Sequence, residues 1–337
     1  MSTPLSVEAP AAGRELEYGS AINEAFVQLL ESDPDVILIG QGLWSPWYVG
    51  SSMVALEKRF GTDRVIDCPV SENATTGIAI GAAMAGMRPV MVHPRMDFMV
   101  LATDQIFNQA AKAHYMFGGA INVPVVIRGI INRGGEQAAQ HSQALQSIYM
   151  HQPGLKVVMP STAYDAKGLL ISSVYDGNPV IYIDDRWLYS QKDAVPEALY
   201  RVPLGKGAIR REGRDVTIVA TSYMNVEALK AAEALAAEGV ECEIVDPRTL
   251  KPLDEDLIIS SVAKTGRLVV ADAAWRMCGA ASEIAALVAE KAFGHLRAPI
   301  QCVTLAESPA PSAAPLEKAY YPWADDVAAA VRRTLAS

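Results

Sequence analysis

Two short segments of this 337-residue chain carry residue types suited to proton transfer. Glu72 lies directly before a run of small residues that predicts a helix over residues 77–87. Its carboxylate suits acid–base chemistry, although spacing alone favours a plain role at a helix start, complementing the helix dipole. His141 follows a long connection, residues 129–140, and such connections are often functional lids. A histidine there can equally be an ordinary polar loop residue, so both roles stay open.

Common cofactor and nucleophile motifs are missing from the sequence. The first predicted strand ends at Gly40 and is followed by Gln41 and Gly42, not by a dinucleotide-binding GxGxxG, and a phosphate-binding GxxxxGK[ST] is absent. Neither GxSxG nor HExxH occurs. The spacing of Gly77 and Gly81 favours close helix packing over phosphate binding. An NAD-binding enzyme is therefore a poor interpretation.

The elements that must position these residues alternate along the chain. Short apolar runs predict strands at residues 36–40, 65–66, 89–92, 123–127, 156–159 and 180–183, with helices at 16–30, 77–87, 101–116 and 163–175. A second series has strands at 216–220, 243–245, 268–270 and 300–305 and a helix near 226–237. Continuous apolar strands between amphipathic helices indicate parallel sheets covered on both faces. We therefore predict an α/β fold with two doubly wound domains.

The predicted domain boundaries follow the breaks in this pattern. Residues 1–14 read as a flexible tail, residues 15–190 as the first domain, residues 191–213 as a linker and residues 214–337 as the second domain.

Composition limits the possible partners and the compartment. A formal net charge of -9 argues against nucleic-acid binding, and no apolar run approaches the ~20 residues of a membrane helix. The N-terminal residues lack a basic region followed by an apolar stretch, so we expect no secretory signal. The four cysteines (Cys68, Cys242, Cys278 and Cys302) show no metal-binding or disulfide spacing, which fits a cytoplasmic protein and predicts no metal site.

Several spaced motifs resemble one enzyme family. The matching segments are residues 69–72, 77–86, 104–112, 115–119, 140–143, 153–158 and 246–254. They resemble the β subunit of the thiamine-diphosphate-dependent first component of 2-oxoacid dehydrogenase complexes, of the pyruvate, acetoin or branched-chain type. This resemblance implies an N-terminal pyrimidine-binding domain and a C-terminal transketolase-type domain.

The resemblance also implies roles for four residues. Glu72 matches the glutamate that holds the cofactor's aminopyrimidine and favours its imino tautomer. Phe98 matches an aromatic residue that stacks on this ring, although a simple core role is compatible. His141 matches a histidine near the reacting carbonyl, as an acid–base group or as a donor to developing oxyanion charge. Gln41 occupies a cofactor-lining place where the family typically has an acid.

A partner subunit is implied as well. In this family a GDG…N motif on an α subunit holds the diphosphate and its Mg²⁺, and this chain has no GDG. We therefore expect an α2β2 heterotetramer that also works with a lipoyl acyltransferase. The small-residue helix and residues 96–116 are either contact surfaces or internal core. A monovalent cation near residues 118–128, as in some relatives, is a further possibility.

Some positions depart from the family pattern. His93 and Arg95 lie in a segment, residues 92–95, that replaces a mostly acidic and then apolar one, and Ala74 and Thr75 replace a glycine followed by an aromatic or aliphatic residue. His93 and Arg95 would add donors and positive charge, which suggests a polar, anionic or hydroxylated substrate. The alternative is that these side chains pair with the partner subunit.

The leading functional prediction is a subunit that decarboxylates a 2-oxo acid and transfers the acyl group to lipoamide. The first alternative is a split transketolase or a biosynthetic two-carbon transferase that uses a ketose or acyl donor. The second alternative is a non-catalytic scaffold subunit.

Overall fold

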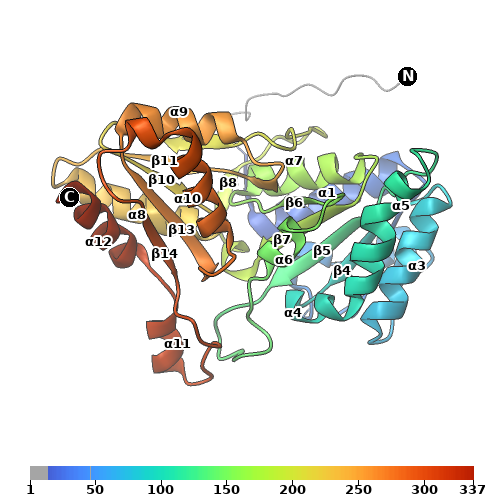
Figure 1. The fold of residues 1–337 in the computed structure, drawn as a ribbon. Helices are drawn as coiled ribbons and strands as arrows, with labels where there is room; N and C mark the ends of the chain where they lie inside the picture. The colour runs from blue at the N-terminus through green and yellow to red at the C-terminus, as the bar shows by residue number, and fades with distance from the viewer. Residues whose placement is uncertain (1–13, 46) are drawn as a thin grey trace. The chain divides into compact units, whose positions relative to one another are not determined.

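The computed structural model describes residues 14–45 and 47–337 (Figure 1). The chain divides into two compact units. The first comprises residues up to 132 together with residues 148–204, and the second comprises residues 133–147 and 205–337. Each unit is described by itself below. None of the described helices is long and apolar enough to cross a membrane.

The first unit is built on a parallel sheet with the strand order β6-β7-β5-β4-β2-β3. These strands are β2 (Val36–Gly40), β3 (Val65–Asp67), β4 (Arg88–His93), β5 (Val126–Ile131), β6 (Lys156–Val158) and β7 (Val180–Asp185). A separate antiparallel pair joins β1 (Glu15–Glu17) to β8 (Lys192–Ala194).

The helices of the first unit cover this sheet. They are α1 (Tyr18–Ser32), α2 (Leu56–Phe60), α3 (Glu72–Met84), α4 (Met96–Met99), α5 (Ala111–Met116) and α7 (Ala163–Val174), with short turns η1 (Gly50–Met53), η2 (Val100–Ala102) and η4 (Arg186–Leu188) and the π-helical η3 (Gln105–Ala110). Helix α6 (Gln146–Met150) starts in the segment that belongs to the second unit. Helices α1 and α7 pack together and α3 packs along β4 (Figure 1). Every residue of β2, β5 and β7 is buried, so both faces of the sheet are covered, which explains the continuous apolar runs.

The second unit has its own sheet, in the order β14-β13-β10-β11-β9. Its elements are β9 (Ala208–Arg211), β10 (Val216–Ala220), α8 (Met224–Ala236), β11 (Cys242–Asp246), β12 (Thr249–Lys251), α9 (Glu255–Thr265), β13 (Leu268–Trp275), α10 (Ala280–Lys291), η5 (Phe293–His295), β14 (Gln301–Leu305), α11 (Ala314–Tyr320) and α12 (Ala324–Leu335). One apolar core joins the sheet to α8 and α12, and the other joins it to α9 and α10. Two separate cores with different helices confirm the doubly wound α/β class.

Several predicted boundaries differ from the structure. The strand predicted at residues 123–127 begins only at Val126, because Pro124 has no N–H to donate and Val125 turns back to bond the Val123 carbonyl. Helix α3 starts at Glu72, five residues before the predicted helix. The helix predicted over 101–116 is interrupted by the π-helical η3. The range assigned to a linker contains β8 and β9, and β9 pairs antiparallel with β11.

A buried ion pair ties the middle of the first sheet together. Arg128 on β5 donates two hydrogen bonds to Asp184 on β7, both at 2.8 Å, and both side chains are fully buried. The hydroxyl of Tyr189 also donates to Asp184, at 2.6 Å. Arg128 makes a further bond of 2.9 Å to the Ser52 hydroxyl. Because each charge is taken out of water, removing one partner leaves the other uncompensated.

We expect the substitution Arg128→Leu to lower the free energy of unfolding by about 3–5 kcal/mol, since the Asp184 carboxylate then stays buried without a cation. Chemical denaturation measures this change. The control is Arg59→Gln, which breaks an exposed pair with Glu31 and should cost less than about 1 kcal/mol. Equal small losses in the two variants would contradict a structural role for the buried pair.

Candidate active site at the carboxyl edge of the first sheet

Three neighbouring strands bring polar residues to one edge of the first sheet. Gly40 at the end of β2 pairs with Asp67 on β3 and with Val92 on β4, and all three strands are parallel. Gln41 therefore follows β2 at the edge where His93 ends β4. Glu72 opens helix α3 shortly after β3. Ligands of open α/β sheets bind at this carboxyl edge.

A tight turn after β2 shapes this edge. The Gly42 N–H donates to the Asp67 carboxylate at 2.6 Å, and Gly42 has φ +64°. A Cβ atom at this position would lie 2.3 Å from the Tyr48 ring, so only glycine fits between the turn and that ring. The turn thereby holds Gln41 and Tyr48 close to the strand ends.

Glu72 is buried at the first turn of α3. Glu72 is only 6% exposed, and no described residue donates a hydrogen bond to its carboxylate. Burial raises the pKa of the neighbouring Cys68 thiol, and the charge of Glu72 contributes to that rise. The helix start lowers the cost of burying a negative charge at this position. A buried carboxylate that no described residue bonds is available to a ligand.

His93 contacts the same face of helix α3. Its Nε2 lies 3.2 Å from the Oγ1 of Thr76, one helical turn after Glu72. Burial lowers the pKa of His93 to about 4, so the ring is neutral at pH 7. This corrects the expectation that His93 brings positive charge to the site. The Nδ1 of His93 and the Nε2 of Gln41 are both buried without a hydrogen-bond partner among the described residues.

Arg95 and Phe98 follow β4 at the same edge. The Arg95 guanidinium lies over the Tyr48 ring, 5.8 Å from its centroid, and donates to the Pro94 carbonyl at 3.0 Å. Phe98 sits in α4 between fully buried methionines, yet its own side chain is only partly buried. The residue is therefore partly accessible, which is compatible with stacking on a ligand.

The predicted histidine lies in the second unit. His141 belongs to residues 133–147, which are anchored there by Arg133, whose guanidinium donates to the Ala273 carbonyl at 3.0 Å. At the other end, Gln146 donates to Asp272 at 3.0 Å. Because Glu72 lies in the first unit, a site that combines Glu72 with His141 stays a prediction.

Two residues of this arrangement were not singled out from the sequence. Thr76 has a usable signal, because it stands four residues after Glu72 and so shares its helix face. No local sequence pattern points to Asp272, because its contact with Gln146 joins residues 126 positions apart. Asp272 also accepts a 2.7 Å bond from Thr221, and burial raises the pKa of its carboxyl.

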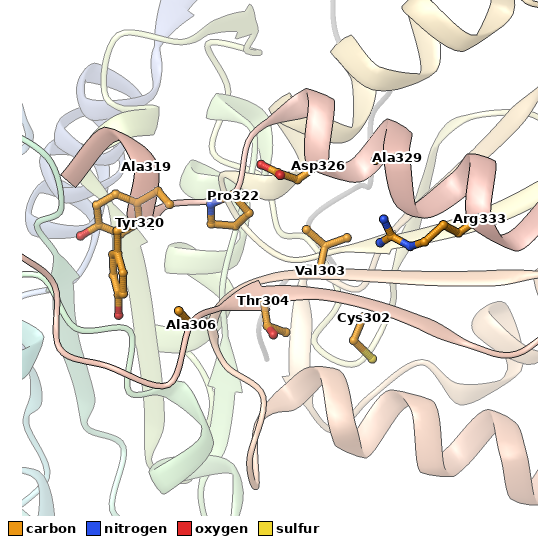
Figure 2. Close-up of a pocket in the computed structure, with 11 residues that line it drawn as sticks. Cys302, Val303, Thr304, Ala306, Ala319, Tyr320, Pro322, Asp326, Ala329 and Arg333 are labelled. Carbon is orange, nitrogen blue, oxygen red and sulfur yellow. The ribbon is translucent and has the colours of Figure 1, made fainter. Parts of the chain in front are cut away.

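The second unit also contains a cavity of about 330 Å³ beside β14 (Figure 2). Its lining includes Cys302, Tyr320, Asp326 and Arg333, and none of the predicted site residues. Asp326 accepts from the Trp323 N–H at the start of α12, and Arg333 donates to Gln301. The charged groups of the cavity therefore have structural partners, and we assign it no chemistry.

Comparison with known proteins agrees with this organisation. Residues 14–191 match the pyrimidine-binding domain of transketolase, and residues 205–327 match the transketolase C-terminal domain. Over 95% of this chain, the fold is similar to that of a solved split-gene transketolase in an inactive β4 tetramer, with a TM-score of 0.75, 24% identity and 98% of that chain covered. The fold is thus that of a transketolase-type protein with a pyrimidine-binding domain.

Sequence relatives define the family more closely. The chain is 47% identical to the β subunit of acetoin:2,6-dichlorophenolindophenol oxidoreductase of Cupriavidus necator, over 96% of this chain and 98% of the relative. The corresponding Bacillus subtilis subunit is 41% identical, over 93% and 95%. The pyruvate dehydrogenase E1 β subunit of Rickettsia felis is 42% identical, over 95% and 98%. The chain belongs to the family of β subunits of thiamine-diphosphate-dependent first components of 2-oxoacid dehydrogenase complexes.

Because His93 is buried, we expect part of the free energy of unfolding to depend on pH. An imidazole with a pKa of about 4 when folded and about 6.5 when unfolded contributes stability that is complete above pH ~6.5. That contribution, on the order of 3 kcal/mol, is lost as the pH falls from ~6.5 towards 4. Unfolding of the wild type and of His93→Asn across this range measures it, because the variant lacks the titrating group. An NMR titration midpoint for His93 near 6.5 would contradict the assignment.

Proposed function

We propose that this chain supplies the pyrimidine half of a thiamine diphosphate site and, with an α partner, releases an acyl group by cleaving the bond beside a substrate carbonyl. The substrate is a 2-oxo acid or a related ketone, and the acyl acceptor is lipoamide. The observation that carries the proposal is the buried Glu72 carboxylate, which receives no hydrogen bond from the described residues at a sheet edge where ligands bind.

The residues at this edge fit the aminopyrimidine end of the cofactor. Glu72 presents a carboxylate that can exchange a proton with the ring nitrogen N1′, and the partly accessible ring of Phe98 can stack on the heterocycle. Gln41 lines the same edge. When bound, the cofactor supplies the nucleophilic carbon that reacts with the substrate carbonyl. His141 acts there as a donor to developing oxyanion charge or as an acid–base group.

The partner is an α subunit in an α2β2 heterotetramer, which holds the diphosphate and Mg²⁺ through its GDG…N motif. The outer face of α3 supports such an interface, because Ile78 is 64% exposed and Leu101 nearby is 57% exposed. No described atom lies within 4 Å of the place where a Cβ on Gly81 would stand. Met96 and Met99 are fully buried, so this part of residues 96–116 is core. An apolar, exposed helix face with a glycine is suited to close contact with another subunit.

Three further features belong to the proposal. A lipoyl acyltransferase receives the acyl group, and the protein works in the cytoplasm, where its four free thiols would stay reduced. A monovalent cation near residues 118–128 supports the fold or the site. Replacing K⁺ by a bulky organic cation in the assay tests this last feature.

The relatives leave the acyl donor open between two classes. Two carry acetoin, a neutral 2-hydroxyketone, in their names, and the third is named for pyruvate, a charged 2-oxo acid. The polar residues His93 and Arg95 at the proposed site bear on this choice.

We expect Glu72→Gln to lower turnover of the assembled complex by about 100-fold or more, since an amide cannot exchange the proton that the carboxylate carries. Steady-state assays measure the loss, with assembly checked by size-exclusion chromatography. Glu255→Gln is the matched control, because Glu255 is also the first residue of a helix but pairs with Lys291 on the surface. Normal turnover in the assembled Glu72→Gln complex would support the scaffold alternative instead.

The interface proposal makes a separate prediction for Gly81. A Cβ atom on Gly81 meets no described atom within 4 Å, so we expect the Gly81→Phe β subunit to fold but no longer to assemble with its α partner. Gly177→Phe is the control, because Gly177 also faces open space but lies at the end of α7. Co-purification with a tagged α subunit distinguishes the two. Full assembly of both variants would place the interface elsewhere.

A further inference from the structure

Two glutamates join the segment that carries His141 to helix α11 of the second unit (Figure 1). The Glu136 N–H donates to the Glu317 carboxylate at 3.0 Å, and the Glu136 carboxylate accepts from the Ala314 N–H at 3.3 Å. Ala314 is the first residue of α11, and the first N–H groups of a helix have no acceptor within it. Each glutamate therefore satisfies a backbone donor of the other element, and Glu317 does so while it is 7% exposed.

The backbone of this segment depends on such bonds to keep its conformation. Glu136 has φ +61° and Ala138 has φ +59°, so both lie in the left-handed region although neither is a glycine. A side chain makes this conformation costly, and it persists only where the surrounding structure fixes it. The bond to Glu317 starts at one of the strained residues. Loss of this bond should therefore let residues 134–140 adopt other conformations.

A second anchor holds the other end of the segment. Gln146 is fully buried and donates to Asp272 on β13 at 3.0 Å, and the Thr221 hydroxyl donates to the same carboxylate oxygen at 2.7 Å. His141 stands five residues after Glu136 and five residues before Gln146. Its own side chain is only partly buried. The two anchors thus hold the segment on both sides of an imidazole that stays accessible.

We propose that Glu317 is a positioning residue for His141, because its bond to the Glu136 N–H fixes the segment that places the imidazole for the reaction. Gln146, through Asp272, holds the same segment from its other end. This inference rests on the proposed function, since it explains how the second unit holds a residue to which that function gives a role.

A double-mutant cycle tests whether Glu317 acts through His141. In the assembled, cofactor-loaded complex, kcat and KM are measured for the wild type, Glu317→Ala, His141→Ala and the double variant, with whichever of acetoin and pyruvate the complex turns over. We expect Glu317→Ala alone to lower kcat about tenfold and to change KM less than about twofold, because a misplaced group loses most of its contribution. In the His141→Ala background, the same substitution should change kcat less than about twofold. Losses that multiply would overturn the inference.

Two further variants keep the test decisive if Glu317→Ala does not fold. Glu317→Gln retains an oxygen that can accept from the Glu136 N–H, so its kcat should stay within about threefold of the wild-type value. Gln146→Met keeps a buried side chain of similar length but removes the donor to Asp272. It should reproduce both the loss of kcat and the dependence of that loss on His141. Wild-type kcat in Gln146→Met would contradict the proposed anchoring.

Glu227→Ala is the matched control. Glu227 in α8 is also a buried glutamate, 2% exposed, and it accepts from the N–H of Ala324, the first residue of α12, at 2.9 Å. It joins α8 to α12 and not to the segment that carries His141. Its substitution should leave kcat within about twofold of the wild-type value. A loss equal to that of Glu317→Ala would show a general effect of weakening the second unit and would overturn the inference.

Hydrogen exchange gives a readout that does not depend on turnover. Measured by mass spectrometry on the assembled complex without substrate, amide exchange in residues 133–147 should be at least about tenfold faster in Glu317→Ala than in the wild type or Glu317→Gln. Unchanged exchange would contradict the anchoring. Full turnover in His141→Ala would overturn this inference alone. The proposed function fails separately, if the wild-type complex binds no thiamine diphosphate or if Glu72→Gln retains full turnover.

Discussion

Everything at the candidate site depends on the parallel pairing of β2, β3 and β4, which end at the same edge of the first sheet. Backbone bonds within the sheet fix the positions of Gln41 and His93 and the start of helix α3. The site can therefore hold Glu72, Gln41 and His93 in fixed places, with His93 also bonded to Thr76. Rigid elements of this kind position functional groups more accurately than loops do.

Buried polar groups in the middle of the first sheet have different surroundings from those at its carboxyl edge. In its middle, Arg128 and Asp184 bond each other as well as Ser52 and Tyr189, which stabilises the fold. At its carboxyl edge, Gln41 Nε2 and His93 Nδ1 are buried without a partner among the described residues, and Glu72 is 6% exposed. Proteins place unsatisfied buried groups mainly where a ligand completes them. One nitrogen of Arg128 also lacks a partner among the described residues, so the argument for a binding site rests on where Glu72, Gln41 and His93 lie, at the sheet edge where ligands bind.

Sequence patterns were sufficient for the architecture, whereas the site residues stay predictions. Continuous apolar runs predicted β2 and β10 with their observed bounds, because both faces of these strands are buried. The resemblance singled out Glu72, and the structure places it at the start of α3. The neutrality of His93 was not predictable, because it follows from burial in the folded chain. The membership of His141 in the second unit depends on contacts such as that between Gln146 and Asp272, which no local pattern encodes.

The central claim is that the Glu72 carboxylate binds the pyrimidine ring of thiamine diphosphate. The most direct measurement is an experimental structure of this chain assembled with its α partner and the cofactor. Our account predicts that a Glu72 carboxylate oxygen lies within hydrogen-bonding distance of the pyrimidine nitrogen, with the ring against the ends of β2, β3 and β4. A cofactor bound elsewhere, with Glu72 facing only water, would contradict it.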